Sequence, residues 1–185
     1  MKITYAAPTA SLQRWFWWLL LMNILFIVCA EFYLRPLTYG EMVRFAVAKD
    51  ASIAETIVLE WKQMGKYAKA MQGIYVNCLF IGLYTAGLAV ACAFLSRLTG
   101  HEILIRAGKG AFWLLIAAAI CDIIANVAMM RSLQEAITHW NITLTYDMAA
   151  AKFSVIILCL LFILVCLIFW LGNKLFSKDY TSMFF

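Results

Sequence analysis

Residues 149–171 read AAAKFSVIILCLLFILVCLIFWL, and no charged side chain follows Lys152 in this stretch. Its length is close to the ~20 residues that an α-helix needs to cross about 30 Å of hydrocarbon. Three further apolar blocks of similar length occupy residues 15–34, 73–95 and 111–130. Since a β-barrel would instead show alternating segments of about 10 residues, the sequence predicts an all-α integral membrane protein, one domain with four transmembrane helices in a bundle.

The composition agrees with burial in lipid. Of the 185 residues, 14% are charged and 65% are hydrophobic, whereas about a quarter of a soluble domain is charged. The six cysteines all lie inside the apolar blocks, where they act as small apolar residues and predict no disulfide framework. The net charge of +5 is not gathered on a basic, aromatic surface, so a nucleic-acid partner is not expected.

The distribution of basic residues predicts the orientation. Four spans place both termini on the same side of a membrane. The compact connection after the second block carries Arg97, Arg106 and Lys109, and two basic residues without an acid precede the first block. Because cytoplasmic loops carry such an excess, we expect the chain to be N-in and C-in. The short loops and missing disulfides favour a bacterial inner membrane, with residues 35–72 outside.

The external loop at residues 35–72 contains two helix-start signatures. Thr38-x-x-Glu41 and Ser52-x-x-Glu55 both have the form of a capping box, which predicts a short helix over residues 39–49 and another helix from Ser52. No proline interrupts the chain from Ser52 to the end of the second block. We therefore expect the second transmembrane helix to extend outside the membrane as one continuous helix. The alternative is two helices with a bend at Gly65 or Gly73.

An apolar stripe follows the expected extension. Its members recur at spacings of three and four residues and are Ile57, Trp61, Met64, Ala68 and Met71. One interpretation is that the short 39–49 helix or the membrane interface covers the stripe. The other is that the same helix of a second subunit also covers it, because one short helix is too small for the whole stripe. The second interpretation predicts a homo-oligomer.

A polar cluster is expected in the interior of the bundle. Asp122 lies near the middle of the third block, and an acid there costs roughly 2.5–3.5 kcal/mol on insertion scales. Asn126 lies one turn later on the same face. Counting from the helix ends places Tyr84 and Thr85 of the second block at a similar depth, with Asn23 of the first block nearby. We expect Asp122 to be neutral and to fix helix packing; the alternative is an ion or proton site.

The sequence contains no motif that names a reaction. Glycine-rich phosphate loops, catalytic triads, HExxH and paired external cysteines are missing, so no enzyme activity, cofactor or metal is expected. We expect a non-catalytic multi-pass membrane subunit that self-associates and anchors or signals to a soluble partner, as in bacterial envelope stress or phage defence. The aromatic C-terminal tail, residues 176–185, would bind a cytoplasmic protein. The alternative is an oligomeric channel or transporter that uses Asp122 and Asn126.

Overall fold

The computed structural model describes residues 10–182, with side chains through residue 175. Within this range the chain forms six helices and no strand. The helices are α1 (Ala10–Leu34), α2 (Tyr39–Ala46), α3 (Ala51–Gln63), α4 (Tyr67–Leu98), α5 (Glu102–Gln134) and α6 (His139–Ser182). Four of them, α1, α4, α5 and α6, are long and apolar enough to cross a membrane. The predicted all-helical architecture with four long apolar helices is therefore confirmed.

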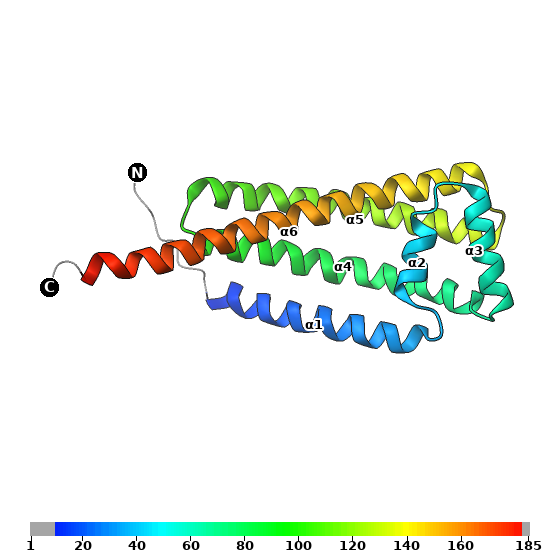
Figure 1. Cartoon of the computed structure of the whole chain (residues 1–185), viewed down its shortest axis with the longest axis horizontal. Helices are drawn as coiled ribbons and strands as arrows, with labels where there is room; N and C mark the ends of the chain where they lie inside the picture. The colour runs from blue at the N-terminus through cyan, green and yellow to red at the C-terminus, as the bar shows by residue number, and fades with distance from the viewer. Residues whose placement is uncertain (1–9, 183–185) are drawn as a thin grey trace.

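The four long helices lie side by side along the longest axis of the molecule (Figure 1). Helices α4, α5 and α6 pack on one another, whereas α1 packs chiefly on α4. The start of α1 and the end of α6 lie at the same end of the bundle, and the short helices α2 and α3 lie across the opposite end. Helix α1 is thus attached to a three-helix core along one side only.

Helix α2 begins where its capping box predicts. The Thr38 side chain accepts a hydrogen bond from the Glu41 backbone N–H, and the Glu41 carboxylate accepts one from the Thr38 backbone N–H at 2.8 Å. The Lys66 ammonium also lies 2.8 Å from Glu41. Burial alone would raise the pKa of Glu41, but the bonds from Lys66 and Thr38 and the charge of Lys66 hold that pKa below its ordinary value. This carboxylate ties α2 to the start of α4.

The continuous helix expected from Ser52 is not present. Helix α3 ends at Gln63, Gly65 has a φ of +67°, and α4 begins at Tyr67. The Lys66 backbone N–H donates to the Trp61 carbonyl at 2.7 Å, which closes the turn. The alternative of two helices with a bend at Gly65 is therefore the correct one. The second signature also differs, because α3 begins at Ala51 with Asp50 at its N-cap and has no side-chain cap bond.

We expect Gly65→Ala to destabilise the protein by about 1 kcal/mol, because a Cβ is disfavoured at positive φ even where no neighbouring atom obstructs it. Gly82→Ala, inside α4 and also free of neighbours within 4 Å, is the matched control and should be neutral or slightly stabilising. Thermal unfolding in detergent measures both. Equal effects of the two substitutions would contradict the role assigned to the turn.

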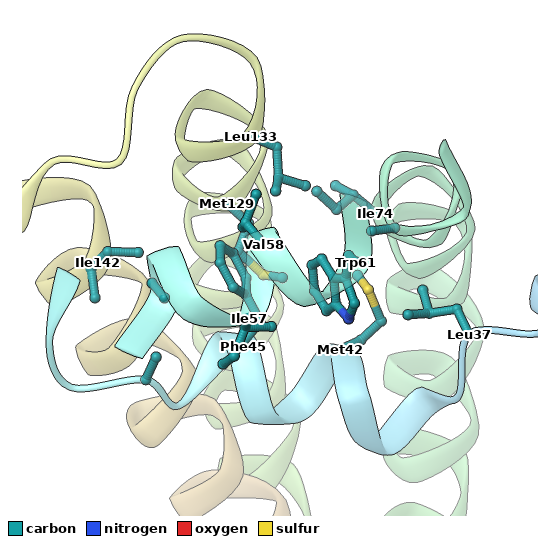
Figure 2. Packing of buried hydrophobic residues seen from close by; sticks show 13 residues of the cluster. Leu37, Met42, Phe45, Ile57, Val58, Trp61, Ile74, Met129, Leu133 and Ile142 are labelled. Carbon is teal, nitrogen blue, oxygen red and sulfur yellow. The ribbon is translucent and has the colours of Figure 1, made fainter. Parts of the chain in front are cut away.

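A hydrophobic cluster fills the space beneath α2 and α3 (Figure 2). Trp61 of α3 packs against Phe45 of α2 with ring centroids 5.3 Å apart, and both side chains are almost completely buried. Other members come from α4, α5 and α6, including Ile74, Met129 and Ile142. Helices α2 and α3 therefore form a lid that is packed onto the end of the bundle, and we call them the lid.

The lid changes the interpretation of the apolar stripe. Ile57 and Trp61 are each only 1% exposed and lie in the chain's own cluster, with Met71 packed at its edge. Met64 is 63% exposed, and Ala68 is also exposed. Ile57 and Trp61 are thus unavailable to a second subunit, because α3 lies across the end of the bundle and packs both side chains into the cluster beneath it (Figure 2). Self-association stays a prediction, and of this stripe only Met64 and Ala68 remain exposed to support it.

Candidate functional site

The most unusual feature of the interior is a buried ion pair. Lys152 of α6 lies with its Nζ 2.7 Å from Oδ1 of Asp122 on α5, and each side chain is less than a tenth exposed. They are the only charged residues that are buried in the part of the chain described. A buried charge of one sign is costly, but a paired one offsets much of its desolvation penalty. The charge of each residue therefore compensates for the burial of the other in the interior of the bundle.

Three further side chains complete what we call the polar cluster. Tyr84 donates from its hydroxyl to Oδ2 of Asp122 at 3.0 Å. Asn77 donates from Nδ2 to Oδ1 of Asp122 at 3.3 Å and to Oδ1 of Asn126 at 3.0 Å. The Asn126 amide in turn lies 3.4 Å from the Cys78 sulfur. Through these bonds the cluster joins α4, α5 and α6, the three helices of the core.

Hairpin geometry explains why these residues meet. Asp122 lies 12 residues before the end of α5 at Gln134, and Lys152 lies 13 residues after the start of α6 at His139. Because both helices rise about 1.5 Å per residue from the same connection, the two residues have nearly equal depth. The α4–α5 hairpin places Asn77 level with Asp122 by the same count. The positions of the two interhelical connections therefore determine how deep in the bundle each polar side chain lies.

The predicted site residues separate into two groups. Asp122, Asn126 and Tyr84 come together as expected. Thr85 is buried, but its hydroxyl has no hydrogen-bond partner among the described residues. Asn23 lies elsewhere, donating to the carbonyls of Leu19 at 2.8 Å and Leu83 at 3.2 Å. The sequence therefore predicted the centre of the cluster and not its full membership.

Asn23 instead holds α1 against α4. A Cβ on Gly87 would lie 2.7 Å from the Asn23 amide nitrogen, so only glycine leaves space for this side chain at that level. The amide of Asn23 thereby reaches the backbone carbonyl of Leu83. This polar contact is a local joint between α1 and α4 and is separate from the polar cluster.

Two residues of the cluster, Lys152 and Asn77, were missed. Its place near the start of the last apolar block predicts that Lys152 lies near the end of a span, which leaves Asp122 without a basic partner and therefore neutral. The ion pair corrects that expectation. A signal for Lys152 was present, because a lysine followed by twenty-one uncharged residues requires a partner or access to water. A signal for Asn77 was its spacing of seven residues from Tyr84, which places both on one face of a helix.

The polar cluster also borders two hollows. One, of about 310 Å³, lies toward α2 and includes Glu31, Tyr39 and Asn77 in its lining. The other, of about 840 Å³, is bounded by α1, α4 and α6, and we call it the central groove. Asp122 and Lys152 line both hollows. The ion pair is therefore buried from bulk solvent but is bordered by space large enough for a small molecule.

None of the protein-family models, curated proteins or solved structures compared with the chain matches it. The polar cluster, the lid and the central groove are therefore the features that indicate its function.

Proposed function

We propose that this chain is an integral membrane protein with four transmembrane helices that works as a non-catalytic multi-pass subunit. The Asp122–Lys152 pair carries the proposal. The two opposite charges neutralise each other, and the pair on α5 and α6 accepts further hydrogen bonds from Asn77 and Tyr84 of α4. Such a group is suited to holding three helices together where no water competes for hydrogen bonds. The outward faces of α1 and α6 are apolar over most of their length, as contact with lipid tails requires.

A structural role for the cluster favours a subunit over an enzyme. The Asp122 carboxylate accepts hydrogen bonds from Lys152, Asn77 and Tyr84, so little of its acceptor capacity remains for a substrate. Buried polar groups that satisfy one another fix the register of packed helices. We propose that this register keeps the lid and the long helices in one arrangement, through which the subunit anchors or signals to a soluble protein.

The orientation proposed is N-in and C-in, with the lid outside, in a bacterial inner membrane. We expect single cysteines introduced at Ser11 and Ser177 to be protected from a membrane-impermeant maleimide in intact cells, and one at Thr56 to be labelled. Permeabilised cells provide the control, since all three cysteines should then react. Labelling at Ser11 and Ser177 from outside would invert the topology, and release of the chain by alkaline carbonate would remove the membrane assignment itself.

The partners proposed are the lipid bilayer, a second copy of the chain and a cytoplasmic protein. The exposed residues Met64 and Ala68 beside the turn at Gly65 are the surface that supports self-association. The tail that would bind a cytoplasmic protein, residues 176–185, has side chains outside the described part of the chain. An envelope-stress or phage-defence system is the setting proposed for such a subunit.

The second candidate is an oligomeric channel or transporter. It is favoured by one observation, that hollows reach Asp122 and Lys152. Proton and ion paths generally use several ionisable groups in series, whereas this pair is the only buried one among the described residues. Liposome flux distinguishes the candidates: conductance that is lost in Asp122→Asn, with folding intact, would favour the channel over the subunit.

A further inference from the structure

The central groove follows the bundle over much of its length. On α6 its lining runs from Lys152 to Trp170, a distance of about 27 Å at 1.5 Å per residue. Its other wall is α1, which packs on α4 and leaves the side toward α6 unfilled. Apart from the polar cluster the lining is almost entirely aliphatic and aromatic. A ligand with a long apolar tail fits this shape.

The charges of the groove favour an uncharged ligand. Asp122 and Lys152 are the charged residues in its lining, and each already neutralises the other. An ionic head group would bring a third charge into a place with no counter-ion, at a large desolvation cost. Fatty acids and phospholipid head groups are therefore poor occupants of this position.

The free hydrogen-bonding capacity of the cluster favours an acceptor. An ammonium group has three N–H donors, and among the described residues Lys152 donates only to Asp122. Lys152 itself lines the groove. A ligand carbonyl can accept from such a donor. A diacylglycerol also has ester carbonyls, but its free hydroxyl adds a donor that itself needs an acceptor.

The aromatic side chains at this level favour a flat ring. Phe80 stacks on Phe26 with centroids 5.2 Å apart and lies 5.5 Å from the ring of Tyr84. On α6, the Lys152 ammonium lies 4.7 Å from the ring centre of Phe153. Phe80, Tyr84 and Phe153 all line the groove. Flat rings pack well between aromatic faces.

We propose that the central groove binds an uncharged quinone with a prenyl tail. A ring carbonyl accepts a hydrogen bond from Lys152, the ring lies among the aromatic side chains beside the polar cluster, and the tail follows the groove toward Trp170. The quinone is a bound ligand, and no electron transfer is part of the proposal. The inference rests on the proposed membrane insertion, because the ligand enters from lipid on the open side between α1 and α6.

The test uses the full chain in phosphatidylcholine nanodiscs and a photoreactive azidoquinone with a short prenyl tail. We expect saturable labelling of peptides from α4 and α6 around Phe80 and Phe153. A tail-matched quinone without the azide should compete for it, while oleate and diacylglycerol should not. Labelled peptides are identified by mass spectrometry.

Variants on α1 provide a matched pair. Ile27 lines the groove, whereas Ile24 is equally exposed and lies outside it. Ile27→Trp should lower saturable labelling about tenfold by filling the groove, since this corresponds to the loss of a modest apolar contact area, and Ile24→Trp should leave it unchanged. The double variant Asp122→Asn with Lys152→Met, which removes the ammonium donor without leaving a charge, should also lose labelling.

Labelling that is not saturable, or that is equal in the two α1 variants, would show ordinary partition into lipid and overturn the proposal. Equal competition by oleate or diacylglycerol would overturn the assignment to a quinone. Carbonate extraction of the same protein is measured in parallel. A chain that resists extraction but takes up no label contradicts the quinone alone, whereas a chain that is extracted contradicts the membrane proposal.

Discussion

Lys152→Met is expected to destabilise the protein by about 3–5 kcal/mol, because it leaves the Asp122 carboxylate buried without its counter-ion. Asp122→Leu should have a similar effect by leaving the ammonium group unpaired. The measurement is reversible unfolding in mixed micelles, followed by circular dichroism. Lys69→Met is the matched control, because Lys69 bonds the Tyr33 carbonyl on the exposed surface and its loss should cost less than about 0.5 kcal/mol.

The double variant, Asp122→Leu with Lys152→Met, distinguishes the interaction energy within the pair from the interactions of each residue with its surroundings. If the ion pair is the main interaction, the double variant should be more stable than either single variant, since no unpaired charge remains. The coupling energy should then be several kcal/mol. Single variants as stable as the wild type, or effects that simply add in the double variant, would contradict the ion pair as the joint between α5 and α6.

Trp61→Ala is expected to destabilise the lid by about 3–5 kcal/mol, the usual effect of removing a fully buried aromatic side chain. Met64→Ala, three residues later and 63% exposed, should change stability by less than about 0.5 kcal/mol. Limited proteolysis within residues 35–66 gives a second measurement, because a loosened lid exposes its backbone. Resistance to proteolysis in Trp61→Ala equal to that of the wild type would show that the lid is held by other contacts.

This result also determines how self-association is tested. A glutamate at Trp61 would disrupt the lid whether or not the protein forms an oligomer, because that side chain is buried within the chain. A glutamate at Met64 changes only the exposed surface. We therefore expect Met64→Glu to lower the mass of the particle in mild detergent if the chain self-associates through this surface, with the lid still resistant to protease.

The long helices and the start of α2 were predictable from the sequence for a local reason. Twenty apolar residues in succession, or a threonine three residues before a glutamate, determine the conformation of the residues that contain them. The end of α3 was not predictable in this way. A glycine costs only about 1 kcal/mol in a helix, so Gly65 alone leaves a continuous helix open. The burial of Trp61 against Phe45, a contact between separate segments, supports the turn.

In the polar cluster, too, one part was predictable from local sequence and another depends on contacts between separate segments. Asp122 is conspicuous in an apolar helix. The free-energy cost of an acid in such a helix predicts that its side chain is buried and has a partner. The identity of the partner depends on how far α5 and α6 continue past the apolar blocks, to Gln134 and from His139. Hydropathy does not indicate how far a helix continues through polar residues beyond its apolar block. Once the connections are known, the levels of Asp122, Lys152 and Asn77 follow from the helix rise.

The one-sided attachment of α1 has a consequence for biosynthesis. Helix α1 precedes its packing partner α4 by more than thirty residues in the chain, so under the proposed membrane insertion α1 enters the bilayer before α4 is made. Asn23 is suited to that interval, because its amide already bonds the Leu19 carbonyl of its own helix. When α4 arrives, the same nitrogen gains the Leu83 carbonyl beside Gly87. Asn23 therefore joins α1 to α4 in the folded protein. Before α4 is present, its bond to Leu19 lowers the cost of placing its amide in lipid.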